Sequence, residues 1–449
     1  MRNRYFGRYS TGWKEAAASA LASVTLAMLA LTGAPTAFAQ ESTGGLSTAV
    51  QRYRADVSWL ADDAREGRGM QSAGLTESGE WLIDQFEAIG LEPAGEDGYR
   101  DPFVAQVMVP DPAQPDNPHA GERLPVEAFN VVGRIEAGAA DRLPGVVVVG
   151  AHYDHLGMGG DGSLEPGVRA IHNGADDNAS GTAALLAVAR DLVARSDELR
   201  RDVWFIAFSL EEEGLLGSST FVREPTGGLD TETVYAMLNM DMVGRLTDGK
   251  LQVLGGGSAE EWDEIVAPIC DERQLDCRIG GDGFGSSDQS SFFAAGIPVL
   301  HFFTGTHSEY HKPSDDVELI NAEGGVRVAS LVGDVAVATA NRSEPLTYVE
   351  AKERQSQRMS FKVTLGIVPD YAGPSDGSPG LLLSGVRPEG PAGQAGLERG
   401  DVIVGMGEAE IASIEDYMKV LSTTEPGGTM PVAVIRNGER VVFDVSFEE

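Results

Sequence analysis

The sequence predicts a three-layer α/β/α domain with a mixed, largely parallel sheet, followed by a small β-rich domain. Up to about residue 342, apolar runs alternate with stretches of helical periodicity. The strand runs are almost continuously apolar, which is typical of a sheet covered on both faces. After a polar stretch the chain changes to short strands and glycine turns. We therefore expect an α/β domain over 45–342, a linker over 343–360 and a β-rich domain over 361–449.

The expected elements follow from these patterns in chain order. Apolar runs predict strands of the first domain at Val146–Gly150, Val203–Phe208, Val234–Met240, Leu251–Leu254 and Pro298–Phe303. Helical periodicity predicts helices at Ser180–Arg195, Ala259–Arg273 and Ala322–Ala340. In the second domain we expect strands at Phe361–Val368, Gly380–Val386, Asp401–Met406 and Thr429–Ile435, with one helix at Ile414–Leu421. The Pro-rich segment Pro110–Pro118 is expected to be an exposed loop.

The N-terminus predicts a secretory signal peptide over residues 1–39. Four basic residues precede an apolar stretch from Ala16 to Ala34, and an A-x-A pattern ends at Ala39, ahead of Gln40. An uncleaved membrane anchor is the alternative, because the stretch approaches the length that spans a bilayer. No later run is apolar enough to do so. We expect cleavage after Ala39 and an exported protein, periplasmic or secreted, with no membrane partner.

The mature chain is strongly acidic. Without residues 1–39 its formal charge is −38, from 30 basic and 68 acidic residues. Such a surface repels phosphate backbones, so we expect no nucleic-acid partner. Solubility explains the charge most simply, and an acidic cleft that attracts amino termini is the alternative. The two cysteines, Cys270 and Cys277, can form one disulfide or remain a buried free pair.

Five residues that commonly bind metal ions lie at the ends of the strand-like runs. A buried carboxylate after an apolar strand is unfavourable unless it is paired or metal-bound. Two imidazoles and three carboxylates suit a pair of zinc-like ions with N and O ligands. The five candidates are His152, Asp177, Glu212, Asp241 and His311. Together they predict a two-metal hydrolase.

Neighbouring residues are expected to support this site. Asp154 lies two positions after His152 and can hold its far ring nitrogen, whereas His155 is expected to face elsewhere. Of the adjacent Asp176 and Asp177, we choose Asp177 to bridge two cations and leave Asp176 as a supporting or capping residue. Among Glu211, Glu212 and Glu213, one would bind metal and another would take a proton from water.

The series GAHYDH, GADDNASG, EEEGLLGS, LNMDMVG and YHKPSDD resembles the co-catalytic di-zinc peptidase family, which includes secreted bacterial leucine aminopeptidases and glutamate carboxypeptidase. The resemblance covers about residues 80–341. It implies that His152 and Asp241 bind one zinc ion, that Glu212 and His311 bind the other, and that Asp177 bridges both.

The resemblance also implies catalytic roles. Glu211 would be the general base, Asp154 would orient His152, and Tyr310 would stabilise the tetrahedral intermediate. Two departures are visible. Three glutamates replace the usual pair, so the register depends on the following Gly214–Ser218. Ser287-Asp288-Gln289 stands where many relatives have Ser-Asp-His, and we assign it no catalysis.

The C-terminal part resembles a PDZ domain of the kind attached to bacterial proteases. The matching residues are Leu365-Gly366-Ile367, Gly390-Pro391-Ala392, Ala395-Gly396-Leu397 and Gly400-Asp401-Val402-Ile403. The resemblance implies that this domain binds the C-terminus of a peptide or protein by strand addition. A β-rich lid or a dimerisation module is the alternative.

These observations predict an exported, zinc-dependent exopeptidase with two Zn²⁺ per chain, although other divalent metals also suit such ligands. We favour an aminopeptidase acting on peptides with a free N-terminus. A carboxypeptidase or dipeptidase would need a cation for the terminal carboxylate, for which Arg169, Arg245 and Lys312 are candidates. A glutaminyl-cyclase-like transferase or a non-catalytic PDZ scaffold would also be compatible with the sequence.

Overall fold

We analysed a computed structural model of the chain. It describes residues 37–447 except 111–120, 161, 166, 351–362, 370–373, 375–377, 388, 389, 408 and 413. Most of the predicted signal peptide, most of the predicted Pro110–Pro118 loop and residues 351–360 of the predicted linker lie outside the described residues. Within the described part of the chain, no helix combines the length and apolarity needed to cross a membrane.

Nine strands of the described residues form one mixed sheet in the first domain. The order across the sheet is β1 (Glu92–Pro93), β3 (Gly121–Ile135), β5 (Asp202–Phe208), β4 (Val146–His152), β6 (Val234–Met240), β9 (Val299–Phe303), β7 (Lys250–Leu254) and β8 (Asp276–Gly280). In addition, β2 (Arg100–Pro110) pairs with β3. Strands β5, β4, β6 and β9 are parallel, whereas β3 runs antiparallel to β5, and β7, which is parallel to β8, runs antiparallel to β9. The parallel character is therefore strongest in the centre.

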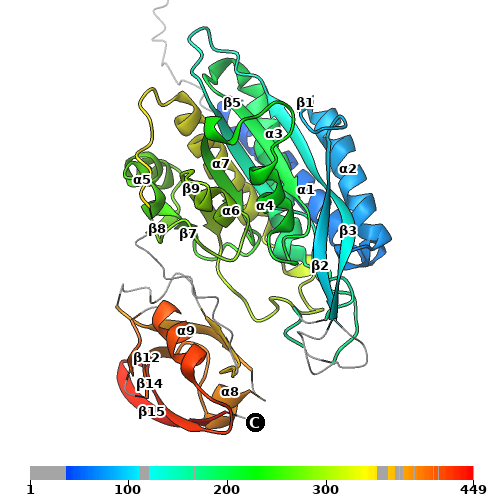
Figure 1. Cartoon of the computed structure of the whole chain (residues 1–449). Helices are drawn as coiled ribbons and strands as arrows, with labels where there is room; N and C mark the ends of the chain where they lie inside the picture. Colours follow the sequence, from blue (N-terminus) through cyan, green and yellow to red (C-terminus); the bar gives the residue numbers. More distant parts are fainter. Residues whose placement is uncertain are drawn as a thin grey trace, which may run out of the picture. The chain divides into compact units, whose positions relative to one another are not determined.

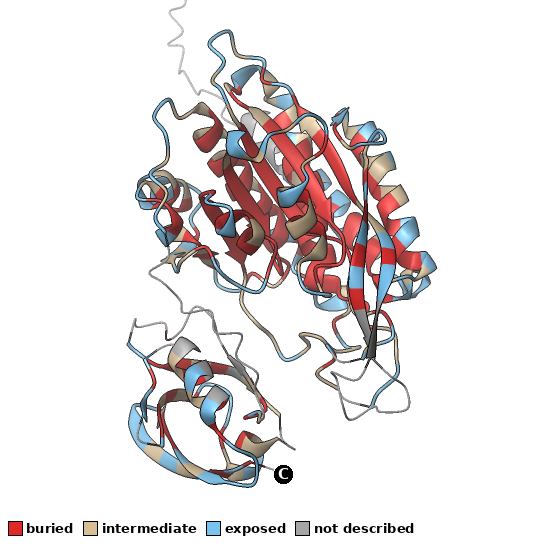
Figure 2. Cartoon of the chain, viewed as in Figure 1, coloured by how far each residue is buried: buried red, intermediate tan, exposed pale blue. Residues whose placement is uncertain are grey.

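Helices cover both faces of this sheet (Figure 1). One face packs against α1 (Ala37–Leu60), α2 (Ala73–Ile89), α3 (Gly181–Ala194), α5 (Trp262–Glu272) and α7 (Ala322–Asn341). The other face packs against α4 (Leu216–Arg223) and α6 (Gln289–Ala294). Along β4, Val147 and Val149 enter the first core, whereas Val146 and Val148 enter the second. This alternation buries the strand completely and confirms the three-layer prediction (Figure 2).

Parallel neighbours bring their carboxyl ends to one edge of the sheet, where ligand sites form in folds of this class. Asn130 of β3 stabilises the chain as it leaves β5 at this edge. Its side chain accepts a hydrogen bond from the Ser209 amide and donates one to the Gly217 carbonyl. A Cβ at Gly217 would lie 2.5 Å from the Asn130 Oδ1, so this close approach requires glycine. The loop that carries the three glutamates is thus held at both ends.

Two features beyond the sheet complete the first domain. Cys270 at the end of α5 and Cys277 in β8 form a disulfide, which resolves the two possibilities left open by the sequence. The described beginning of the predicted linker packs against the domain. Thr347 hydrogen-bonds to Glu261 through its amide and its hydroxyl, and the Tyr348 ring packs against Phe293.

The second domain is β-rich, as predicted, and its sheet is antiparallel. Its order is β10 (Ile367–Pro369), β11 (Leu381–Val386), β12 (Val402–Met406), β14 (Thr429–Arg436) and β15 (Glu439–Ser446), and β13 (Ala409–Glu410) pairs with β12. The domain also contains α8 (Pro391–Ala395) and α9 (Ile414–Thr423). Its own core includes Leu365, Ile403 and Val434.

Candidate metal centre

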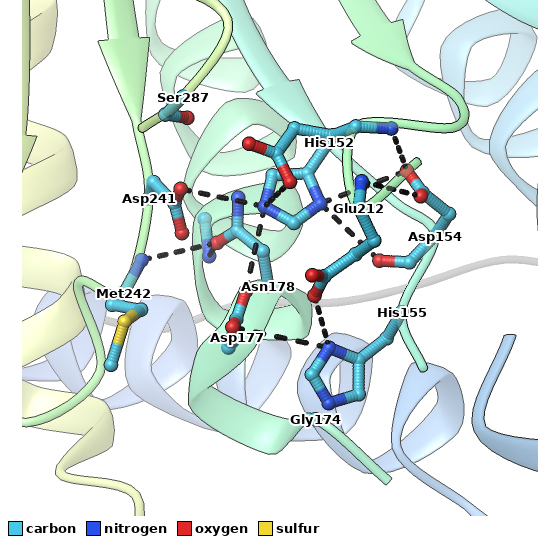
Figure 3. Close-up of polar contacts among 12 residues, drawn as sticks. His152, Asp154, His155, Gly174, Asp177, Asn178, Glu212, Asp241, Met242 and Ser287 are labelled. Atoms are coloured by element: carbon cyan, nitrogen blue, oxygen red, sulfur yellow. Dashed lines mark hydrogen bonds and ion pairs between the residues drawn. The ribbon is translucent and has the colours of Figure 1, made fainter. Parts of the chain in front are cut away.

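The structure brings all five predicted ligands to the carboxyl edge of the first sheet. His152 is the last residue of β4, and Asp241 follows β6 directly. Asp177 lies in the turn before α3, Glu212 follows β5, and His311 lies in the loop after β9. Figure 3 shows His152, Asp177, Glu212 and Asp241 converging on one another.

Three buried residues on one side of Asp177 form what we call the strand group: His152, Glu211 and Asp241. The His152 Nε2 lies 3.5 Å from Asp177 Oδ1 and 3.4 Å from Asp241 Oδ2. It lies 3.9 Å from Glu211 Oε2. Separations of this size are expected for atoms that share one cation at about 2 Å.

Three residues on the other side form what we call the loop group: His155, Glu212 and His311. The His311 Nε2 lies 3.1 Å from Asp177 Oδ2 and 3.3 Å from Glu212 Oε2. Its Nδ1 lies 2.8 Å from the Gly162 carbonyl, so Nδ1 donates there and Nε2 presents its lone pair to the carboxylates. The two oxygens of Asp177 therefore face the two groups separately, which is the geometry of a bridging carboxylate.

Burial makes this cluster strongly attractive to positive charge. Burial raises the pKa of Glu211 well above its usual range, despite the opposing effect of His152, and the charge of Glu212 adds to the rise. Burial alone would lower the pKa of His152, but Glu211 and Asp241 raise it well above the usual value. The pKa of His311 rises to about 11, because Glu212 and Asp177 outweigh its burial. Excess negative charge thus dominates the site.

The donor set fits divalent cations. Two groups of three side chains, His152–Glu211–Asp241 and His155–Asp177–Glu212, each place their ligand atoms within 4.8 Å of one another. His152 Nε2 and Asp241 Oδ1 are buried without a hydrogen-bond partner among the described residues. Imidazole nitrogens and carboxylate oxygens are common zinc ligands, and two nearby cations would offset the buried negative charge.

Asp154 lies beside the far ring nitrogen of His152 and also contacts the loop that carries the glutamates. Its Oδ1 lies 3.7 Å from His152 Nδ1, whereas its backbone carbonyl lies closer, at 3.3 Å. The carboxylate also accepts hydrogen bonds from the backbone amides of Glu211 and Glu212, at 3.1 and 3.2 Å. Asp154 therefore holds the glutamate pair through the main chain, in addition to lying beside His152.

The expectation that the His155 ring faces away from the site is wrong. Its Nδ1 lies 2.7 Å from Glu212 Oε1 and its side chain is fully buried. The expectation assumed strand alternation beyond His152, but β4 ends at that residue. The chain then turns, so alternation does not apply to His155.

Sequence reasoning also missed Arg68, which is buried beneath the site. Its guanidinium donates hydrogen bonds to the backbone carbonyls of Leu60, Tyr153, Asn173 and Gly174, at 2.7–2.9 Å. Burial lowers its pKa to about 10, although Asp154 and other carboxylates of the site oppose that effect. Arg68 joins the end of α1 to the chain just after His152 and to the turn before Asp177.

Three supporting side chains complete the site. Asp315 is buried and accepts hydrogen bonds from the backbone amides of Asp176 and Asp177. Asp176 itself accepts from the Gly244 amide, so it serves the fold around the turn. The Tyr310 ring stacks on His311 with ring centroids 3.9 Å apart, and burial raises its pKa well above 10.

The two motifs that depart from the family pattern are the run of three glutamates and Ser287-Asp288-Gln289. Glu213 is exposed, whereas Glu211 and Glu212 point into the site. Ser287 and Gln289 contact Asn239 of β6. Asp288 is fully buried, which raises its pKa to about 7.

Comparison with known proteins assigns both domains. Residues 130–336 match peptidase family M28, and residues 360–447 match the PDZ domain family. The chain is 31% identical over 218 residues to aminopeptidase YwaD of Bacillus subtilis, covering 45% of this chain and 43% of that protein. It is 31% identical over 197 residues to leucine aminopeptidase 1 of Uncinocarpus reesii, covering 39% and 46%. The chain thus spans less than half the length of these two relatives.

The fold also matches solved structures. A Zn-dependent exopeptidase from Parabacteroides distasonis superposes with a TM-score of 0.50 at 18% identity, covering 65% of this chain and 98% of that one. At this identity the match concerns the fold alone.

Proposed function

We propose that this chain, which joins a peptidase family M28 domain to a PDZ domain, is an exported zinc aminopeptidase with two Zn²⁺ per chain. The observation that carries the proposal is the position of Asp177, whose two oxygens face His152 and His311 separately. The family match and the aminopeptidase names of the relatives support the reaction class.

The site residues suit hydrolysis of a peptide bond. When bound, two zinc ions would supply Lewis acidity and lower the pKa of the attacking water. Glu211 belongs to the strand group and would take the proton from that water, then give it to the leaving amine. The Tyr310 ring stacks on His311, and its hydroxyl, which is protonated at neutral pH, would donate a hydrogen bond to the oxyanion. The acidic surroundings favour a substrate with a free ammonium group.

A carboxypeptidase is supported less well. That activity needs a cation for the terminal carboxylate, and Arg245 is a half-buried candidate from the sequence. Its Nη2 lies 3.0 Å from the buried Asp315, so it already has a carboxylate partner. A single-ion transferase is also less well supported, because the ligand atoms form two groups. A non-catalytic scaffold leaves Glu211 without a role.

The decisive experiment is an activity profile of the zinc-reconstituted protein. We expect hydrolysis of leucine anilides and of peptides with free amino termini, loss of that activity with a chelator, and recovery with zinc. N-acetylated forms of the same peptides should be resistant. Hydrolysis of N-acylated dipeptides with release of the C-terminal residue would contradict the aminopeptidase assignment.

Two further parts of the proposal have their own tests. We infer export from the N-terminal sequence, so the mature protein should begin at Gln40 when its N-terminus is sequenced.

We also infer that the PDZ domain binds the C-terminus of a peptide or protein. Binding of a peptide with a free C-terminal carboxylate, lost on amidation, would support it, whereas equal binding of both forms would contradict it.

A further inference from the structure

The loop group contains a histidine that none of the expected ligand assignments uses. His155 Nδ1 lies 2.7 Å from Glu212 Oε1, whereas His311 Nε2 lies 3.3 Å from Glu212 Oε2. The two oxygens of one carboxylate are therefore divided between two imidazoles. Figure 3 shows the His155 ring directed at the end of Glu212.

The contact with Glu212 fixes which ring nitrogen of His155 donates. A carboxylate that binds a metal ion is ionised and can only accept hydrogen bonds. At 2.7 Å from Glu212 Oε1, the Nδ1 of His155 is therefore the donor. Its Nε2 is buried without a hydrogen-bond partner among the described residues, which favours an unprotonated Nε2, since a buried donor without an acceptor is unfavourable.

The ring also has little freedom to turn. A Cβ at Gly174 would lie 2.5 Å from the Cδ2 of His155, and Gly174 adopts a positive φ of 55°. The backbone amide of His155 donates to the carbonyl of Arg68 at 3.2 Å. His155 is therefore held from both its ring and its main chain while it contacts Glu212.

We propose that His155 is a positioning residue for the second metal ion: its Nδ1–H holds Glu212 Oε1, so that Glu212 binds the ion through Oε2. The inference rests on the proposed two-ion site. Ligating carboxylates commonly need such a hydrogen-bond partner, and its loss weakens metal affinity about 10–100-fold.

The distances favour this role over direct ligation by His155. Its Nδ1 lies 4.0 Å from Asp177 Oδ2, whereas His311 Nε2 lies 3.1 Å from the same oxygen. His311 Nε2 thus lies near both Asp177 Oδ2 and Glu212 Oε2, at 3.1 and 3.3 Å. Although His155 belongs to the same group of ligand atoms, its close contact is with the other oxygen of Glu212.

The test compares His155→Leu with His155→Asn in the full chain. Leucine removes the donor, whereas the Asn side-chain amide places an N–H at nearly the position of Nδ1. Metal-free protein would be titrated with Co²⁺ and with Zn²⁺, and the dissociation constant of each ion measured by absorption and by calorimetry. His172→Asn is the matched control, because His172 is also buried but bonds to Ser163 and to the Ala170 carbonyl.

We expect His172→Asn to bind two ions per chain, each with an affinity similar to that of the wild-type protein. His155→Leu should bind one ion about 10–100-fold more weakly and the other within about twofold of wild type. His155→Asn should recover most of the loss. Thermal unfolding of the metal-free variants checks that each is folded.

Three results would overturn the inference. If His155→Leu binds both ions with unchanged affinities, His155 does not position Glu212, and the two-ion site of the proposed function is unaffected. An equal loss in His155→Asn and His155→Leu would show that the imidazole itself is the ligand. Binding of no more than one ion by wild-type protein would overturn both this inference and the two-ion part of the proposed function.

Discussion

The strand group and the loop group offer the same kinds of ligand atom, but the chain holds them in different ways. His152 ends a buried strand, and the Asp241 amide still donates to the carbonyl of Phe302 in β9. In the loop group, Glu212 depends on Asp154 and His155, and His311 has a positive φ of 55°. The sheet places His152 and Asp241 of the first group, whereas the Asp154 side chain holds the main chain of Glu211 and Glu212 and His155 holds the side chain of Glu212. The loop group should therefore be more sensitive to single substitutions nearby.

The largest expected effect separates two neighbouring glutamates. Glu211→Gln should reduce kcat by about 10³-fold, because an amide cannot take a proton from water. Two ions per chain should remain bound. Glu212→Gln should instead lose one ion, because it removes a ligand of the loop group. Metal analysis of the purified variants together with steady-state kinetics checks both outcomes, and wild-type rates in Glu211→Gln would show that another residue is the base.

Arg68→Met tests how much the protein depends on the buried support of the backbone around both groups. Four backbone carbonyls would lose their donor, so the free energy of unfolding should fall by about 3 kcal/mol or more. The measurement is urea unfolding of metal-free protein. Arg134→Met is the control, because its half-exposed ion pair with Glu92 should contribute about 1 kcal/mol or less. Equal losses in both variants would argue against a special role for Arg68.

Removal of the disulfide tests whether a change at the outer strand β8 affects the activity of the metal centre. The double variant Cys270→Ser/Cys277→Ser opens a short loop with a sequence separation of 7, so stability should fall by about 2 kcal/mol. The bond joins α5 to β8 at the edge of the sheet, and kcat/KM should remain within about twofold of wild type. A large loss of activity in a folded variant would show that the outer strands influence the site.

The smallest expected effect concerns Asp101, which contacts the Asn130 side chain that holds the glutamate loop. Burial raises the pKa of Asp101 from 3.8 to about 6, so the folded state favours its neutral form. The stability from this group is present below about pH 4 and is lost as pH rises through 6. Asp101→Asn should therefore raise Tm by about 2 °C at pH 7.5 and leave it unchanged at pH 4. Equal shifts at both pH values would contradict this linkage.

Much of the central fold could be predicted from the sequence, because its strands are continuous apolar runs. Val234–Met240 was predicted with the bounds that the structure has, and the helix predicted at Ala322–Ala340 differs by one residue. The β2–β3 hairpin was not predicted. In β2 the buried residues Asp101, Phe103 and Ala105 alternate with exposed ones. This alternation indicates a strand less clearly than a continuous apolar run does.

The site was predictable where a polar residue interrupts or ends an apolar strand. Asp241 and His152 stand out in this way, and the structure brings both to the same edge. His155 and Arg68 do not stand out. The contacts of His155 depend on where β4 ends, and Arg68 contacts carbonyls up to 106 positions away, which no local pattern reveals.

The contacts of Arg68 have a consequence for how the protein can be divided. The region that matches peptidase family M28 begins at residue 130 and contains every ligand atom described above. A fragment cut at those bounds would omit α1, α2 and Arg68, and the carbonyls of Tyr153, Asn173 and Gly174 would then lack their shared donor. The smallest autonomous unit must therefore start well upstream of its first metal-binding residue.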